Sequence, residues 1–256
     1  MPGNLVIIPT YNERENIEKM VESISSLNVD FDILVVDDNS PDGTGDVVES
    51  LQKKYKNLNL IRRKAKLGLG TAYIKGFKWA LERNYNIICE MDADFSHNPE
   101  DLVRLYNTCM KGIDLAIGSR YISGVNVVNW PLGRVIMSYM ASIYVRMVTG
   151  LKVKDTTAGF KAYKREVLET IDLDNIRSRG YAFQIEMKFT TWKFGFRIKE
   201  IPIIFTERQG GASKMSGGIF NEAFWGVLKM KYRSFFRDYK RERKNEKTNT
   251  QGRDNK

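Results

Sequence analysis

Three clusters of acidic and amide side chains each follow directly on an apolar run of the chain. Pro9-Thr-Tyr-Asn-Glu13 follows the first run, Asp37-Asp-Asn-Ser-Pro-Asp42 the second, and Asp92-Ala-Asp94 a later one. Singly, such residues usually form turns or cap the next helix. Two carboxylates two positions apart on a loop also suit a hard divalent cation that takes oxygen ligands and bridges phosphates. Together, the three clusters favour a site for a phosphate-bearing ligand and a divalent cation.

The sequence offers little for zinc binding or for an activated nucleophile. His97 is the one histidine, and a loop position explains it better than a role as a base. Cys89 and Cys109 are too few for a metal quartet or a disulfide framework, so we interpret both as reduced cytosolic thiols with a structural role. Ser–His and Cys–His nucleophilic catalysis are therefore disfavoured.

Apolar runs and amphipathic segments alternate through the first half of the chain. Strands are predicted over Asn4–Ile8, Asp32–Val36, Leu58–Ile61, Asn86–Met91 and Asp114–Ile117, with helices between them that begin near Asn12, Thr44, Thr71 and Pro99. This order predicts an α/β fold with a Rossmann-like, mostly parallel sheet flanked by helices. The carboxyl ends of parallel strands lie along one edge of a sheet, so all three polar clusters are expected to line one cleft there.

The pattern changes after Ser119. Arg120–Gly150 is typical of amphipathic helices, Asp155–Lys164 of a loop or edge strand, and Glu200–Phe205 of a strand whose proline places it near an edge. A basic amphipathic helix is predicted over Ile219–Lys240, with an apolar stripe of Phe220, Phe224, Val227, Leu228, Tyr232, Phe235 and Tyr239. We expect a catalytic domain over residues 1–218, a membrane-interface helix over 219–240 and a disordered basic tail over 241–256.

The positive charge of the chain is unevenly placed. The formal net charge is +10, and Lys229–Lys256 holds eleven Lys/Arg against four Asp/Glu, so that segment alone supplies seven of the ten. A nearly balanced body argues against nucleic-acid binding, which calls for a basic face on the folded domain. The chain starts almost at once on a predicted strand, so we expect no signal peptide, and its longest apolar stretch, Val135–Val145, is shorter than the ~20 residues that cross a bilayer.

Taken in order, these motifs resemble the family 2 inverting glycosyltransferases with a GT-A fold, and most of all the dolichol-phosphate (polyprenol-phosphate) mannose synthases. Besides the three clusters, the matches include Lys66-Leu-Gly-Leu-Gly-Thr-Ala-Tyr73, Gly118-Ser-Arg-Tyr121, Trp130-Pro-Leu-Gly-Arg134, Asp155-Thr-Thr-Ala-Gly-Phe160 and Gly180-Tyr-Ala-Phe-Gln-Ile-Glu186. The resemblance covers about residues 4 to 230. A lone Asp-x-Asp is a weak signal, whereas this ordered set is a specific one.

The resemblance implies a role for each matching position. It implies that the nucleoside binds to Pro9, Tyr11, Glu13, Val36 and Asp38, and that the ribose–diphosphate and the metal (Mg or Mn) bind to Asp92, Ala93 and Asp94. Arg208 and Lys214 would also bind the donor diphosphate, and Arg120, Arg134 and Ser138 would bind the acceptor phosphate. Ser96 stands where some relatives place a further metal ligand, often Gln. Asp94, Arg120 and Arg134 are the expected catalytic residues, and Glu186 is expected to be structural or orienting rather than a base.

The implied reaction is inverting transfer of mannose from GDP-mannose to a dolichyl or polyprenyl monophosphate. A phosphate monoester is already anionic near pH 7, so the attack needs placement rather than a base. The expected setting is the cytoplasmic side of a membrane, with peripheral attachment through the 219–240 helix or through a membrane-embedded anchor protein. The alternatives are a UDP-glucose-dependent transferase acting on the same kind of lipid, a sugar nucleotidyltransferase and, least favoured, a nucleic-acid-binding protein.

Overall fold

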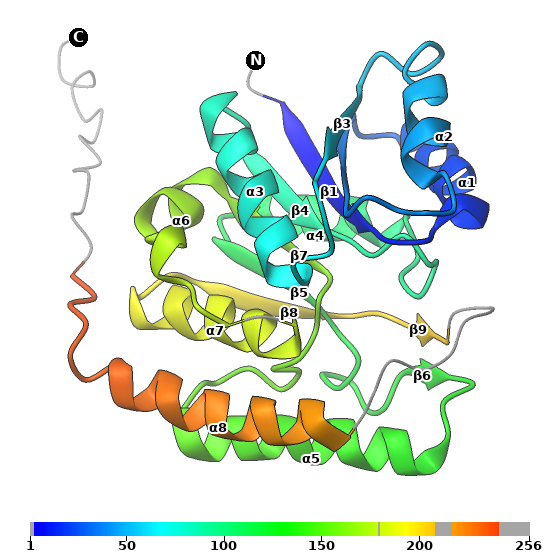
Figure 1. Cartoon of the computed structure of the whole chain (residues 1–256). Helices are drawn as coiled ribbons and strands as arrows, with labels where there is room; N and C mark the ends of the chain where they lie inside the picture. The colour runs from blue at the N-terminus through cyan, green and yellow to red at the C-terminus, as the bar shows by residue number, and fades with distance from the viewer. Residues whose placement is uncertain (1–2, 179, 208–216, 241–256) are drawn as a thin grey trace, which may run out of the picture.

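A seven-stranded sheet with helices on both faces forms the centre of the protein in this computed structural model (Figure 1), which describes residues 3–178, 180–207 and 217–240. The strands are β1 Asn4–Thr10, β2 Phe31–Asp37, β3 Leu58–Arg62, β4 Ile87–Glu90, β5 Leu115–Ser119, β7 Lys161–Lys164 and β8 Ile198–Pro202. They lie in the order β3-β2-β1-β4-β7-β5-β8. A separate two-stranded sheet joins β6 Val127–Val128 to β9 Phe205–Thr206.

The polar clusters follow β1, β2 and β4, and these three strands run parallel as neighbours. In their register Thr10 pairs with Asp37, and Ile7 with Glu90. The carboxyl ends of the three strands therefore meet at one edge of the sheet, as the sequence predicted. β8 is an outer strand of the sheet, which agrees with the position expected from its proline.

The Asp155–Lys164 segment begins as a loop, as we expected, but the strand that follows is not an edge strand. Its last four residues are β7, an interior strand that runs antiparallel between β4 and β5, with Lys161 opposite Glu90. Because β7 runs in the reverse direction, its amino end lies at the edge where β4 ends. The reversal therefore brings the Asp155–Phe160 loop to the same edge as the acidic clusters.

Two helical layers cover the sheet. The helices α1 Arg14–Ser25, α2 Thr44–Leu51 and α4 Asp101–Met110 pack on one face, and α3 Leu69–Glu82, α6 Arg165–Thr170 and α7 Gly180–Lys193 on the other. Gly76 shows how tightly α3 approaches: a Cβ there would lie 2.7 Å from Cγ2 of Ile7. Close packing of this kind fixes the strand ends, and the loops at those ends carry the functional side chains.

Two further helices lie side by side beside α7, at the bottom of Figure 1. They are α5 Leu132–Thr149 and α8 Gly217–Arg233, joined to α7 through the buried residues Val145, Ile185, Phe189, Val227 and Met230. The 120–150 segment thus contains one helix rather than several. No helix in the described ranges has the length and apolar character needed to cross a bilayer.

The C-terminal helix differs from the predicted one. It ends at Arg233 rather than Lys240, and its stripe divides: Val227 is buried, whereas Tyr232 and Phe235 are exposed. Val227 and Met230 belong to the buried cluster with α5 and α7, so α8 packs against the body of the protein through these two residues. Phe220 is outside the side chains that the structure describes, and residues 241–256 are outside the described residues altogether.

Candidate active site

The loops after β1 and β2 are tied together by hydrogen bonds. The backbone N–H groups of Asn12, Glu13 and Arg14 donate to Ser40 Oγ at 3.1 Å, Thr44 Oγ1 at 3.0 Å and Asp42 Oδ2 at 3.1 Å. Asn12 and Asn39 both have positive φ, a conformation that asparagine tolerates better than most residues. These bonds hold the Tyr11–Glu13 turn against the second acidic cluster, and they orient the start of α1.

Tyr11 carries a cation on its ring. Lys66 Nζ lies 4.0 Å from the ring centroid, and the residue is half-buried. The Lys66–Tyr73 motif therefore contributes to the same surface as the loop after β1. The side chain of Val36 is fully buried in the core under this surface, so a ligand could meet only its main chain.

Asp38 is held by an arginine that the sequence did not single out. Arg63 Nη1 lies 2.9 Å from Asp38 Oδ1, both side chains are nine-tenths buried, and Arg63 Nη2 donates to Thr71 Oγ1 at 2.6 Å. Burial raises the pKa of Asp38, and the guanidinium of Arg63 opposes that shift without cancelling it. The carboxylate is thus already engaged by the protein, with the second carboxylate of the pair, Asp37, bound to Thr10 and Ser40.

The Asp92–Asp94 loop is an electrostatically crowded part of the edge. Burial raises the pKa of Asp92 to about 7, with further contributions from the carboxylates of Asp94, Glu90 and Glu13. Because Glu13 contributes to the pKa of Asp92, the loop after β1 lies within electrostatic reach of the loop after β4. Tyr73 Oη donates to Asp92 Oδ1 at 3.5 Å and partly offsets the shift. Without a cation, these carboxylates repel one another.

This crowding fits a divalent cation. The described residues hold no cage of three or more His, Cys, Asp or Glu side chains, so Asp92 and Asp94 would bind a cation whose other ligands come from a substrate or water. Ser96, the third predicted ligand, is buried, and its Oγ finds no hydrogen-bond partner among the described residues, while its backbone N–H donates to Asp94 Oδ1 at 3.1 Å. An oxygen-rich set with an orphaned hydroxyl suits Mg²⁺ or Mn²⁺.

Directly beneath the aspartates lies a buried charge cluster that sequence reasoning missed. Lys161 Nζ lies 3.1 Å from Glu90 Oε1 and donates to Gln184 Oε1, and Gln184 Nε2 donates to Glu90 Oε2 at 2.9 Å. Lys188 donates to the carbonyls of Thr156 and Ala158 at 3.0 and 2.6 Å. Glu90, Lys161 and Lys188 are all fully buried, and burial lowers the pKa of both lysines. The cluster joins β4, β7 and α7 and fixes the base of the acidic loop.

Arg120 forms the other half of the site. Its Nε and Nη2 donate to the two oxygens of Asp155, each at 2.7 Å, and Nη2 also donates to Thr157 Oγ1 at 2.8 Å. Burial alone would raise the pKa of Asp155, but the guanidinium and its hydrogen bonds outweigh that effect, and the pKa is lowered. This two-point pair with Asp155 fixes the plane of the guanidinium. Arginine is the side chain that most often recognises phosphate, and a guanidinium held in a fixed plane suits that role.

The other predicted acceptor residues lie close to Arg120. Arg134 Nη1 pairs with Glu207 Oε1 at 2.5 Å, and its guanidinium lies 4.1 Å from the ring of Trp130. Arg120 also faces the Trp130 ring, at 5.4 Å. Ser138 accepts a hydrogen bond from Tyr121 Oη at 2.8 Å. The structure thus gathers Arg120, Arg134 and Ser138 around one aromatic cluster.

His97 links the two halves of the site. Its ring stacks on Phe160 at 4.8 Å and meets Phe205 edge-on at 5.1 Å. Burial lowers its pKa to about 4; Asp94 and Asp155 act to raise it, and Arg120 acts to lower it further. The ring is therefore neutral at physiological pH and lies within electrostatic reach of both the aspartates and the arginine, a packing role rather than that of a base.

The remaining predicted residues are Glu186, expected to be structural or orienting, and Arg208 and Lys214, expected to bind the donor diphosphate. Glu186 accepts the backbone N–H groups of Arg177 and Ser178 at 3.2 and 2.8 Å, which agrees with the structural role expected for it. Arg208 and Lys214 are outside the described residues, so their grip on a diphosphate stays a prediction.

The fold and the two-part edge site are those expected of a glycosyltransferase with a GT-A-like sheet. Residues 5–172 match the family described as Glycosyl transferase family 2, and the chain belongs to that family. The resemblance seen in the sequence is thereby confirmed, and the protein is a glycosyltransferase.

Two similar proteins are 48% identical to this chain. One, from Mycolicibacterium smegmatis, is named polyprenol monophosphomannose synthase; the match covers 87% of this chain and 86% of that protein. The other, from Micrococcus luteus, is named undecaprenyl-phosphate mannosyltransferase, with coverage of 88% and 92%.

Solved structures agree on the fold at lower identity. The mannosyltransferase PcManGT from Pyrobaculum calidifontis, in complex with GDP-Man and Mn²⁺, is 18% identical with a TM-score of 0.57; the match covers 93% of this chain and 65% of that one. Mannosyl-3-phosphoglycerate synthase from Rubrobacter xylanophilus is 16% identical with a TM-score of 0.60, covering 91% and 74%. The expected mostly parallel, helix-flanked sheet of GT-A type is confirmed.

Proposed function

We propose that this protein transfers mannose from GDP-mannose to the phosphate of a polyprenyl or dolichyl monophosphate, with inversion at the anomeric carbon. One observation carries the proposal. The carboxylate of Asp94, one of the pair suited to a cation–diphosphate, interacts electrostatically with the His97 ring, and so does Arg120, whose guanidinium plane is fixed by Asp155. The names of the two relatives at 48% identity support mannose as the sugar and a polyprenyl phosphate as the acceptor.

The geometry accounts for a reaction that uses no general base. An anionic oxygen of the acceptor phosphate attacks C1 of mannose, and the bond from C1 to the GDP oxygen breaks with its electron pair on GDP. No proton has to leave the nucleophile, so Arg120 and Arg134 need only hold the phosphate in line. The lowered pKa of His97 makes its ring a weak base, and the Glu186 carboxylate is occupied by two backbone N–H groups, so both observations agree with a reaction without a general base.

The donor would lie over the loops after β1, β2 and β4. Tyr11, Pro9 and Glu13 would contact the nucleoside with Asp38 and the main chain of Val36, and Arg208 and Lys214 would add positive charge at the diphosphate. Asp92, Ala93 and Asp94 would meet the ribose and diphosphate, with Ser96 beside them. Asp92 and Asp94 would hold Mg²⁺ or Mn²⁺, which when bound offsets the charge that develops on the departing GDP.

Attachment to the membrane surface forms part of the proposal. The exposed large apolar residues of the α8 region are Phe224, Trp225, Tyr232, Phe235 and Phe236, with Lys229 and Arg233 between them. Aromatic and basic side chains on one surface suit the interface of an anionic bilayer. We place the protein peripherally on the cytoplasmic face. Phe235→Asp/Phe236→Asp should weaken vesicle flotation without unfolding the protein, since neither ring is in the core; undiminished flotation would contradict this part.

A panel of nucleotide sugars tests the activity. Purified protein is incubated with radiolabelled GDP-mannose or UDP-glucose and a short-chain polyprenyl phosphate, with Mg²⁺, with Mn²⁺ or with EDTA. We expect label in the lipid product from GDP-mannose and a divalent cation only. Arg120→Lys, which keeps the charge but loses the two-point geometry, serves as the matched control. Preferential transfer from UDP-glucose over GDP-mannose would show that the sugar is glucose rather than mannose. Absence of transfer from both donors would refute the proposed activity.

A further inference from the structure

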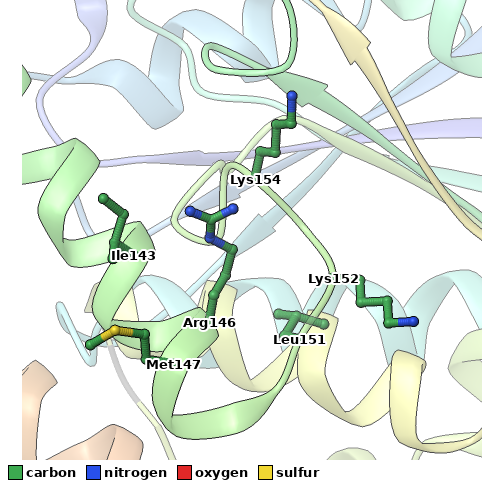
Figure 2. A pocket seen from close by; sticks show the side chains of 6 residues that line it. All are labelled: Ile143, Arg146, Met147, Leu151, Lys152 and Lys154. Carbon is green, nitrogen blue, oxygen red and sulfur yellow. The ribbon is translucent and has the colours of Figure 1, made fainter.

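A pocket of about 490 Å³ lies at the C-terminal end of α5, apart from the residues assigned above. Its lining consists of Ile143, Arg146, Met147, Leu151, Lys152 and Lys154. In Figure 2, Arg146 rises from the helix on the same side as Lys154 on the following loop, while Lys152 extends outward. The pocket thus combines three cations with three apolar side chains.

The side-chain cations of this pocket form no ion pair with an acidic side chain among the described residues, and the Glu200 carboxylate beside Lys154 accepts the backbone N–H of that residue at 2.7 Å. Arg146 Nε is buried without a hydrogen-bond partner in the described part of the chain. Arg146 is also not needed to satisfy the helix terminus. Its own carbonyl accepts the Gly150 N–H at 2.8 Å, and Thr149 O accepts Lys231 Nζ at 3.4 Å. Lys154 Nζ donates to the carbonyl of Ile122 at 3.2 Å and so stays near the rim.

An exposed apolar stripe leads along α5 into the pocket. Leu132, Ile136 and Met140 are 74%, 54% and 56% exposed, and Ile143 and Met147 continue the same row into the pocket lining. The spacings of four, four, three and four residues keep all five on one face of the helix. α5 contains no acidic residue, so nothing on the helix itself repels an anion.

We propose that this pocket binds the phosphate of an anionic membrane phospholipid, whose acyl chains lie along the α5 stripe. The guanidinium of Arg146 would bond the phosphate oxygens, Lys152 and Lys154 would add charge, and Ile143 and Met147 would contact the first methylene groups. Charge complementarity and the continuity of the stripe with the pocket select a lipid over a soluble anion. A phosphate held here needs no covalent step.

The pocket lies next to the residues that hold Arg120, and this position suggests what a bound phospholipid would do. Lys154 immediately precedes Asp155, the carboxylate that holds Arg120, and Lys154 Nζ bonds the loop just after Arg120. A phospholipid bound here would set the height of the proposed acceptor site against the membrane surface. This use rests on the proposed function, whereas lipid binding itself does not.

Vesicle binding of the whole chain tests the site. Flotation is measured with phosphatidylcholine vesicles and with vesicles that also contain phosphatidylglycerol, without polyprenyl phosphate or nucleotide sugar, so a failure of mannosyl transfer would leave this result untouched. Arg146→Gln/Lys152→Gln should lose about 25-fold in affinity for the anionic vesicles, about fivefold for each charge. Lys53→Gln/Lys56→Gln removes two exposed charges near β3 and is the matched control, expected to bind like the wild type.

Two further variants and one kinetic measurement keep the test sharp. Arg146→Lys keeps the charge but loses the planar donor set, so a built site predicts clearly weaker binding, and wild-type binding by this variant would overturn the proposal. Equal losses in the Arg146 and Lys53 double variants would also overturn it. With a water-soluble short polyprenyl phosphate and no vesicles, Arg146→Gln/Lys152→Gln should have the wild-type KM for that acceptor. A raised KM would indicate that the pocket binds the acceptor phosphate instead, and would refute the phospholipid assignment.

Discussion

The buried pair of Glu90 and Lys161 gives a prediction that can be worked out from the structure. Both side chains are fully buried, 3.1 Å apart, and Gln184 bridges them. Lys161→Met fits an apolar chain of similar length into the same space but leaves the Glu90 carboxylate buried without its cation. Losing one partner of a buried ion pair costs about 3–5 kcal/mol, against a typical total stability of about 5–15 kcal/mol.

A matched pair on the surface sets the scale. Lys78 and Asp174 also form an ion pair, but their side chains are 42% and 80% exposed. Lys78→Met removes the same type of cation, and we expect it to change the free energy of unfolding by about 0.5 kcal/mol or less. The contrast between the two Lys→Met variants isolates the effect of burial.

Urea denaturation followed by tryptophan fluorescence measures these differences. Glu90→Gln, Lys161→Met and the double variant complete a cycle, and the double variant should lose less than the sum of the singles by about 3 kcal/mol. Lys161 interacts electrostatically with Asp92, whose pKa Glu90 acts to raise, so losing the Lys161 charge should raise that pKa further and weaken cation-dependent donor binding. The reasoning fails if Lys161→Met is no more destabilising than Lys78→Met, or if the two single losses simply add.

Three other predictions concern the two halves of the site. Asp155→Asn removes the anion paired with Arg120, so we expect a loss of about 3 kcal/mol in unfolding free energy and a raised KM for the lipid phosphate; unchanged values in both would contradict the assigned role. The pKa of Asp155 is lower in the folded protein than in the unfolded chain. The stabilisation that its carboxylate gives is therefore complete above the ordinary aspartate pKa of about 4 and is lost as the pH falls through the lower folded value. Thermal melts from pH 7 to pH 3 should show a larger acid-induced loss of stability in the wild type than in Asp155→Asn. Tyr11→Ala should weaken GDP binding about tenfold through lost base stacking, measured by calorimetry, and Tyr11→Phe should retain it.

Much of the fold could be predicted because the first half of the chain obeys simple periods. Continuous apolar runs such as Ile33–Val36 mark strands buried on both faces, and the polar residues that follow them had to meet at one edge. The Asp92–Asp94 loop and the gathering of Arg120 with Arg134 were therefore accessible from sequence, the second through family resemblance.

The elements that were missed are those whose stability depends on distant partners. β7 is short and carries Lys161, and a lysine in a short strand indicates an edge strand. Its interior position is understandable only because Glu90 lies opposite Lys161 and pairs with it. Arg63 likewise looks like one surface charge in a basic stretch, and its pairing with Asp38 depends on a contact across the β2–β3 edge. α8 ends at Arg233 although its aromatic residues continue, and just past that end Ser234 Oγ donates to the Lys231 carbonyl at 2.6 Å, a local bond that competes with the helical pattern.

The central claim is that Asp92 and Asp94 bind a nucleotide diphosphate together with a divalent cation. Calorimetric titration of GDP-mannose into wild type and Asp94→Ala, each with Mn²⁺ and with EDTA, tests it most directly. We predict tight binding by the wild type with Mn²⁺, weak binding in EDTA, and weak binding by Asp94→Ala under both conditions. Equal Mn²⁺-dependent affinity in the two proteins would contradict the account.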